Sequence, residues 1–260
     1  MKHIYTAEYF DELDRPSYLS ALFFAEKIMP LFRPTSVLDF GCGNGSWLRA
    51  FQEKGVEILR GLDGPWNNGE MLLSAGIEFT QIDFTEIGAS TTKAQQVKAD
   101  LAICVEVAEH IDEKYSDSLL SFLTAASDVI IFSAAFSNQG GEHHVNENYH
   151  SYWAGKFAKL NYEVFDLFRP EFWNNQVIGF WYRQNCFLYV RADSIARDLL
   201  QSKGIEPLRQ IHFMDCVHPE LFHLKCGDGM SFDQVIRQIS PSLARAVKRR
   251  VKRVINKLSG

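Results

Sequence analysis

The sequence of 260 residues has few cysteines and no long apolar run. Its five cysteines are scattered, odd in number and without a Cys-x-x-Cys pair. This pattern argues against a disulfide framework or a thiolate zinc site and favours a reducing compartment. No stretch of about 18 consecutive apolar residues is present, and acidic residues interrupt the N-terminal segment early, unlike a signal peptide. These absences predict a cytoplasmic globular protein.

Positive charge is scarce over most of the chain. The net charge is −5, but seven of the 27 cations lie between residues 242 and 260, a segment without acids. The remaining residues therefore carry 20 cations against 32 acids. Because phosphate contacts need clustered Lys and Arg, we expect no nucleic-acid partner for this acidic body.

The C-terminal segment of residues 242–260 has the spacing of an amphipathic helix, with apolar residues on one side and the cations on the other. A basic helix of this kind suits an anionic membrane surface, here the inner face of the membrane. A helix that docks on the acidic body or on a partner subunit would show the same pattern. Both interpretations stay open.

Short apolar segments alternate with helical ones through the middle of the chain. We expect strands at residues 36–40, 56–62, 77–82, 100–105, 128–133, 163–168 and 186–191. Helices are expected at residues 46–54, 115–126 and 149–160. Apolar strands between helices predict a mostly parallel sheet covered on both faces. Ligands of such sheets bind where the strands end.

The same pattern divides the chain into four parts. Residues 1–34 are expected to form a helical cap, whose helix Pro30 and Pro34 stop. Residues 35–193 form the sheet domain, residues 194–241 an extension, and residues 242–260 the basic helix.

A glycine-rich turn lies between the first expected strand and its helix. Asp39 precedes Gly41, Gly43 and Gly45. Glycines at this place let the backbone approach a ligand at a helix N-terminus. The dinucleotide fingerprint has its third glycine one residue later, where Ser46 stands here. The spacing therefore disfavours a nicotinamide cofactor, and the acidic residue suits an amine-bearing ligand.

This turn resembles motif I of the class I S-adenosylmethionine-dependent methyltransferases. The resemblance implies a Rossmann-like α/β three-layer sandwich with a mostly parallel seven-stranded sheet, N-terminal helices and a C-terminal extension. It also implies S-adenosylmethionine as cofactor, with the ribose at Asp63 and the adenine at Asp83. Either aspartate alone would suit a turn, but their order after successive strands favours the cofactor role. The implied cofactor-binding residues are Asp39, Gly41, Cys42, Gly43, Gly45, Asp63, Gly64, Asp83, Phe84 and Val105.

Two polar segments follow the fourth and fifth expected strands. The first contains Glu106, Glu109 and His110, and the second contains His143 and His144. Because neighbouring parallel strands end at one edge of a sheet, we expect both segments to converge on the transferred methyl group. Carboxylate oxygens and imidazole nitrogens together suit a divalent metal ion.

The spacing of Glu106, Glu109 and His110 resembles ubiquinone-pathway O-methyltransferases and, more closely, small-RNA terminal 2′-O-methyltransferases. The second resemblance implies a Mg²⁺ or Mn²⁺ ion with Glu106, Glu109, His110 and His144 as ligands, and with His143 competing for the last place. The metal would lower the pKa of an acceptor hydroxyl and orient it. The segment also occurs in methyltransferases without metal. There Glu106 and His110 would shape the pocket, and His144 or His143 would act as general base.

Further segments resemble one bacterial methyltransferase family that is associated with cell-surface polysaccharide and glycan biosynthesis. They are residues 5–10, 61–66, 106–110, 132–135, 139–147, 152–153 and 181–185. The resemblance implies a sugar or glycan acceptor. Aromatic candidates for stacking on a sugar are Tyr152, Trp153, Trp173, Trp181 and Tyr182.

We therefore expect an O-methyltransferase for a sugar or glycan hydroxyl. The alternatives are an RNA-end 2′-O-methyltransferase, a methyltransferase with a non-sugar small-molecule acceptor, and a non-catalytic cofactor-binding protein.

Overall fold

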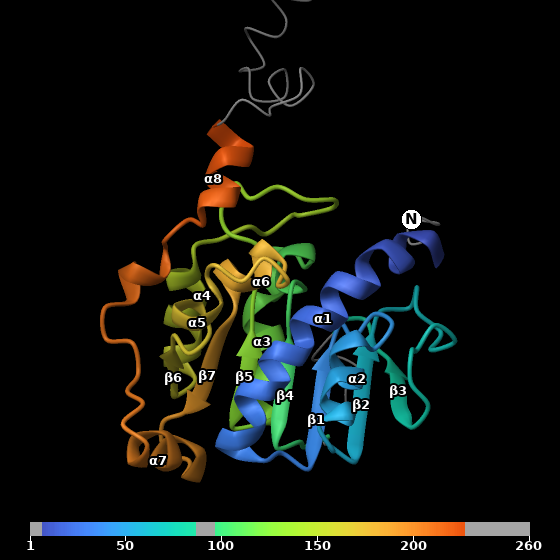
Figure 1. Ribbon diagram of the computed structural model, residues 1–260, viewed down its shortest axis with the longest axis horizontal. Coiled ribbons are helices and arrows are strands. Elements are labelled where there is room, and N and C mark those ends of the chain that lie inside the picture. The colour runs from blue at the N-terminus through green and yellow to red at the C-terminus, as the bar shows by residue number, and fades with distance from the viewer. Residues whose placement is uncertain (1–6, 87–96, 227–260) are drawn as a thin grey trace, which may run out of the picture. The chain divides into compact units, whose positions relative to one another are not determined.

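The computed structural model describes residues 7–86 and 97–226, with side chains from residue 16 on. A seven-stranded sheet with the order β3-β2-β1-β4-β5-β7-β6 forms its centre (Figure 1). The strands are β1 (Ser36–Phe40), β2 (Ile58–Asp63), β3 (Ile77–Gln81), β4 (Leu101–Cys104), β5 (Val129–Phe132), β6 (Tyr162–Phe165) and β7 (Phe187–Arg191). Strand β7 runs antiparallel to β5 and β6, and the other pairs are parallel. The predicted α/β sandwich with a mostly parallel sheet is confirmed.

Successive side chains of the strands enter two cores, one on each face of the sheet. Val37 of β1 lies in the first hydrophobic cluster and Leu38 in the second. Helices α1 (Ala7–Phe32) and α2 (Ser46–Glu53) contribute to the first cluster. Helices α3 (Ser116–Ala126) and α4 (His150–Lys159) contribute to the second. The alternation explains why the central strands read as continuous apolar runs.

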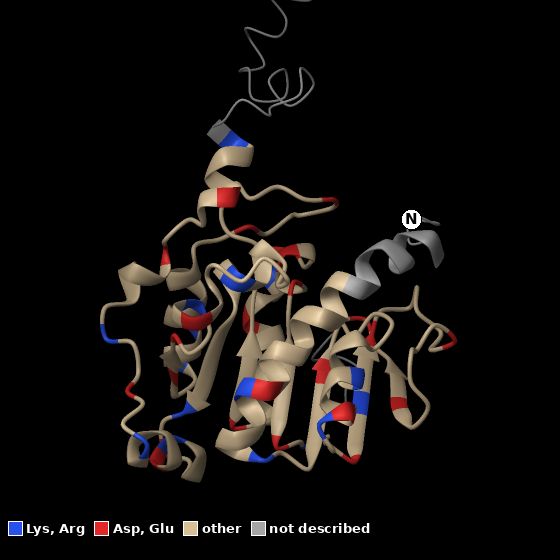
Figure 2. Cartoon of the chain, in the orientation of Figure 1, with Lys and Arg blue, Asp and Glu red and all other residues tan. Residues whose placement is uncertain are grey.

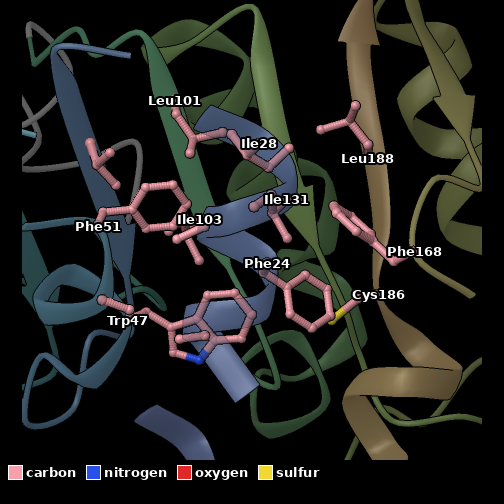
Figure 3. Packing of buried hydrophobic residues seen from close by; sticks show 14 of the residues in the cluster. Phe24, Ile28, Trp47, Phe51, Leu101, Ile103, Ile131, Phe168, Cys186 and Leu188 are labelled. Atoms are coloured by element: carbon pink, nitrogen blue, oxygen red, sulfur yellow. The ribbon is translucent and has the colours of Figure 1, made fainter. Parts of the chain in front are cut away.

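Aromatic side chains of α1 and α2 pack in the first hydrophobic cluster together with residues of the sheet (Figure 3). The ring centroid of Phe24 in α1 lies 5.1 Å from that of Trp47 in α2 and 4.6 Å from that of Phe168. Phe24 is fully buried, and burial of such a side chain stabilises the fold by roughly 1.5–3 kcal/mol. The helix that begins at the glycine-rich turn therefore packs against α1 within the first hydrophobic cluster.

Helix α1 contains Pro16 and Pro30 and runs to Phe32. The helix ends before Pro34, as expected, but the expectation that Pro30 also stops it is wrong. Proline removes the hydrogen bond to the carbonyl four residues earlier, here that of Glu26. Glu26 and Pro30 both lie on the exposed side of the helix, so solvent can satisfy that carbonyl.

The remaining helices connect or follow the strands. They are η2 (Ala108–His110), η3 (Glu113–Tyr115), α5 (Arg169–Phe172), α6 (Phe180–Asn185), α7 (Ile195–Ser202), η4 (Ile211–Met214) and α8 (Pro219–Cys226). The chain divides into two compact units, Met1–Cys216 and Val217–Gly260. The first part of the expected extension belongs to the first unit, since Leu200 and Met214 lie in the two cores.

The basic helix expected at residues 242–260 lies outside the described residues. Within residues 7–86 and 97–226, no helix has the length and apolar character needed to cross a bilayer.

Candidate active site

The glycine-rich turn follows β1 at the edge where the parallel strands end. Gly41, Gly43 and Gly45 all have left-handed backbones, with φ of 76°, 55° and 81°. At Gly41 a Cβ atom would lie 2.4 Å from Cγ2 of Val107, the residue that precedes η2. The turn therefore passes directly against the segment that follows β4, and glycine is required there for both conformation and space.

Asp63 at the end of β2 joins this turn to the next loop. Its Oδ2 accepts hydrogen bonds from the Gly43 N–H at 2.8 Å and from Nδ2 of Asn67 at 3.0 Å. Its Oδ1 accepts from the Gly64 N–H at 2.7 Å. Burial raises the pKa of Asp63, and these hydrogen bonds oppose the rise. Burial raises the pKa of the Asp39 carboxyl well above its ordinary value, and the nearby charge of Asp63 raises it further.

The other residues predicted to contact the cofactor have mixed surroundings. Asp83 closes a local turn, because its Oδ1 accepts from the N–H and the hydroxyl of Thr85. Phe84 is buried, with its ring 6.4 Å from that of Phe40. Cys42 is buried against Gly61. Val105 packs beside the first core cluster.

Glu106 follows β4 in a left-handed conformation, with φ of 55°. Such a backbone costs a residue with a Cβ about 1–2 kcal/mol and is often found at functional sites. Ser133, the residue after β5, holds it: its Oγ accepts from the Glu106 N–H at 2.9 Å and donates to Glu106 Oε1 at 2.7 Å. Nδ2 of Asn185 donates to the same oxygen at 3.2 Å.

Glu109 lies one turn further on and is fully buried. Neither of its carboxylate oxygens accepts a hydrogen bond of good geometry from the described residues. Burial, and next the charge of Glu106, raise the pKa of Glu109 well above its ordinary value. One ligand atom each from Glu109, His110 and His144 lie within 4.8 Å of one another. We call these three residues the Glu-His-His cluster.

The loop of residues 139–149 brings His144 to this cluster. The N–H groups of Val145 and Asn146 donate to the Glu109 carbonyl at 2.8 and 3.0 Å. Nδ1 of His144 lies 2.8 Å from Glu147 Oε1. The ring of His144 rests on Gly141, where a Cβ atom would lie 2.2 Å from its Nε2.

The two imidazoles of the cluster meet edge to face. The ring centroids of His110 and His144 are 4.9 Å apart at an interplanar angle of 86°. Solvent reaches one side of His110, but the protein around its ring and then the neighbouring His144 lower its pKa to about 4. His110 is therefore neutral at pH 7, with a nitrogen lone pair available to a metal.

The structure thus unites three of the four residues predicted as metal ligands. Glu106 lies beside Glu109 but is directed to Ser133 and Asn185. His143, the predicted competitor of His144, is exposed, has a left-handed backbone with φ of 60°, and does not belong to the cluster.

A hydrogen-bonded network behind Glu106 was not assigned a role from the sequence. Nδ2 of Asn185 also donates to Gln139 Oε1 at 3.0 Å. Oδ1 of Asn185 lies 3.1 Å from Nε2 of His150 and accepts from Gln184. The two adjacent amides Gln184 and Asn185, directly before the apolar residues of β7, were the available signal. Their partner Glu106 lies 79 residues from Asn185 in sequence and could not be inferred.

Two of the aromatic residues proposed to stack on a sugar belong to the core. Trp153 is 1% exposed and Tyr182 is 8% exposed, so neither offers a ring face to an acceptor. Tyr152, Trp173 and Trp181 are partly buried. Tyr149, which was not proposed, is 54% exposed and lies on the loop that carries His144.

A family model described as a methyltransferase domain matches residues 1–180. The chain belongs to this family. Together with the class I fold, the match makes the protein an S-adenosylmethionine-dependent methyltransferase. A comparison with curated protein sequences finds no significant match.

Solved methyltransferase structures share the fold. An amino pentose methyltransferase from Micromonospora echinaspora, bound to S-adenosylmethionine, gives a TM-score of 0.52 at 14% identity over 74% of this chain and 99% of that chain. An O-methyltransferase family protein from Burkholderia thailandensis gives 0.51 at 12% identity over 72% of this chain and 58% of that chain. Magnesium protoporphyrin IX methyltransferase from Synechocystis PCC 6803 gives 0.48 at 15% identity over 74% and 90%. At these identities the likeness concerns the fold alone.

Proposed function

We propose that this methyltransferase transfers the methyl group to a hydroxyl of a sugar or glycan, and that the Glu-His-His cluster holds a divalent cation at the acceptor. The observation that carries the proposal is the carboxylate of Glu109. It is fully buried, neither of its oxygens accepts a hydrogen bond of good geometry from the described residues, and one of them lies within 4.8 Å of ligand nitrogens of two imidazoles.

A cation resolves the electrostatics of this carboxylate. A buried carboxylate without a partner is costly, and the site must either bind a proton or a cation. The imidazole of His110 is a poor counter-charge, because its pKa of about 4 leaves it neutral. A metal ion would use both features, since it needs an ionised carboxylate and neutral imidazoles.

The donor atoms favour Mn²⁺ over Mg²⁺. Mg²⁺ is bound almost entirely by oxygen, whereas imidazole suits first-row transition metals. Glu147 engages Nδ1 of His144, which leaves Nε2 as the ligand atom. A carboxylate behind a ligating imidazole is the usual arrangement at such sites, because it fixes the ring and strengthens the ligand.

The cofactor would lie along the turns that follow β1 and β2. Left-handed Gly41 and Gly43 allow close approach, and the Asp63 carboxylate can accept from ribose hydroxyls. Gly41 touches Val107, and Glu109 follows two residues later. The turn and the Glu-His-His cluster are therefore neighbours along this edge, as methyl transfer between them requires.

The reaction is a direct displacement. The acceptor oxygen forms a bond to the methyl carbon while the carbon–sulfur bond of the sulfonium breaks, and S-adenosylhomocysteine leaves. When bound, the cation would lower the pKa of the acceptor hydroxyl and orient it. We assign the hydroxyl proton to Glu106, whose Oε1 is fixed by Ser133 and Asn185 and whose Oε2 has a longer contact of 3.5 Å with the same Asn185 amide.

A sugar suits this site on two grounds. Vicinal hydroxyls can approach one cation together, and the exposed ring of Tyr149 on the His144 loop offers a face for a sugar ring. A terminal ribose of RNA also has vicinal hydroxyls. The acidic body counts against RNA, and Figure 2 shows Lys and Arg scattered among Asp and Glu rather than gathered.

The test is a mass-spectrometric search for acceptors. Nucleotide sugars, surface glycans and short RNAs are incubated with the enzyme, S-adenosylmethionine and Mn²⁺. We expect a gain of one methylene on a sugar, which is lost in excess chelator and in the Glu109→Gln variant. Methylation of RNA alone, or full activity in excess chelator, would overturn the proposal.

A further inference from the structure

Asn67 lies four residues after Asp63 and is only 1% exposed. Its Nδ2 donates to the Gly43 carbonyl at 2.6 Å and to Asp63 Oδ2 at 3.0 Å. Its Oδ1 accepts from the Gly69 N–H at 2.9 Å. Its backbone carbonyl accepts from Nε2 of Gln81 at 2.7 Å. One buried residue therefore connects the loops after β1 and β2 with the end of β3.

The chemistry of these partners fixes the orientation of the amide. The carbonyl of Gly43 can only accept a hydrogen bond, and the N–H of Gly69 can only donate one. If the Asn67 amide were reversed, its oxygen would face the Gly43 carbonyl and its NH₂ group would face the Gly69 N–H, so that two acceptors and two donors would oppose each other. Both hydrogens of Nδ2 and the oxygen Oδ1 are thus committed, and this geometry specifies asparagine.

Asn67 and Asp63 together grip the Gly43 residue. The N–H of Gly43 donates to Asp63 Oδ2, and its carbonyl accepts from Asn67, which donates to the same Oδ2. This closed set of contacts commits Oδ2 to the protein. Oδ1 accepts from the Gly64 N–H, and the Trp66 side chain also hydrogen-bonds this carboxylate. The carboxylate is therefore held in one orientation.

We propose that Asn67 is a positioning residue for the cofactor, which presets the Asp63 carboxylate for the ribose hydroxyls and locks the glycine-rich turn. The proposal rests on the assignment of Asp63 to the ribose. Asn67 does not touch the cofactor in this role and acts through Asp63. Groups held in place before binding contribute affinity because less freedom is lost on association.

A role in loop stability alone makes a different prediction. Loss of Asn67 leaves the buried Gly43 carbonyl without its donor, and this lowers stability whatever ligand is used. A positioning role acts through the ribose hydroxyls. Its effect must therefore depend on whether the ligand carries them.

The experiment compares two ligands by calorimetric titration, S-adenosylhomocysteine and its 2′-deoxy analogue. For Asn67→Ala we expect about tenfold weaker binding of S-adenosylhomocysteine. We expect a clearly smaller loss for the 2′-deoxy analogue. Asn68→Ala is the matched control, because Asn68 is exposed and its Oδ1 accepts from the nearby Glu70 N–H. This variant should bind both ligands like the wild type.

Asn67→Ser serves as the second variant in case Asn67→Ala does not fold. We expect a smaller loss of affinity, again larger for S-adenosylhomocysteine than for its 2′-deoxy analogue. Equal losses for the two ligands would overturn the positioning role alone. Failure of wild-type protein to bind S-adenosylhomocysteine, or unchanged binding by Asp63→Ala, would overturn the assignment of Asp63 and this inference with it.

Discussion

His144 and Glu147 form a close pair, with 2.8 Å between Nδ1 and Oε1. Both side chains are shielded, with 12% and 17% of their surface exposed. The N–H of Gly140 donates to the same glutamate oxygen at 2.6 Å. Glu147 is therefore fixed by its own loop and in turn fixes the direction of the His144 ring.

Replacement of Glu147 by glutamine removes the negative charge behind the ligand imidazole. We expect the affinity for Mn²⁺ to fall about 10–100-fold, as is usual when the partner of a ligating histidine is lost. Titration of the free Mn²⁺ signal by electron paramagnetic resonance measures it. Glu142→Gln changes an exposed glutamate of the same loop and should have no such effect. Equal Mn²⁺ affinity of the two variants would show that Glu147 does not support metal binding.

A methyl group at Gly141 should displace His144. The Cβ of Gly141→Ala would lie 2.2 Å from Nε2 of His144, so the ring must move away from the cluster. We expect loss of Mn²⁺ binding while S-adenosylhomocysteine still binds.

Gly155→Ala in α4 is the control for the glycine replacement, because nothing lies within 4 Å of the added carbon. It should be as stable as the wild type or more stable by up to about 1 kcal/mol. Retained Mn²⁺ affinity in Gly141→Ala would show that the position of the His144 ring does not matter for metal binding.

His150 predicts a dependence of stability on pH. It is 2% exposed, and burial lowers its pKa to about 4, although the Met214 carbonyl lies 2.8 Å from Nδ1. Between pH 4 and about 6.5 the unfolded chain binds a proton at this residue that the folded chain does not. Its contribution to stability is therefore present above pH 6.5 and is lost as the pH falls toward 4.

Chemical denaturation of the wild type and His150→Gln across this pH range isolates that contribution. The difference in free energy of unfolding between them should shrink by up to about 3 kcal/mol from pH 6.5 to pH 4. Because the two proteins share all other titrating groups, their effects largely cancel. A difference that does not change with pH would contradict a neutral buried His150.

The sheet and its cofactor edge were predictable because their signals are local. Apolar runs such as β4 and β5 end in polar or glycine-rich segments, and parallel topology brings those ends together. The N-terminal helix was also predictable, but its passage through Pro30 was not, since the sequence does not show that Pro30 faces solvent.

The supporting residues of the site were beyond the sequence for a different reason. The bond between Asn185 and Glu106 spans 79 residues, and residue type says little about burial. Trp153, for example, is of a residue type that often stacks on sugars, but its side chain is buried in the core. His143 and His144 are neighbours in the chain, and only the left-handed turn at His143 separates their surroundings.

Glu109 is the central ligand of the proposed metal site. The direct measurement is a Mn²⁺ titration of wild-type protein and Glu109→Gln, with S-adenosylhomocysteine binding as the check that both are folded. We expect one Mn²⁺ site in the wild type and at least about tenfold weaker binding in the variant, with equal affinity for S-adenosylhomocysteine. Wild-type protein that binds no Mn²⁺, or a variant that binds it as tightly, would contradict the account.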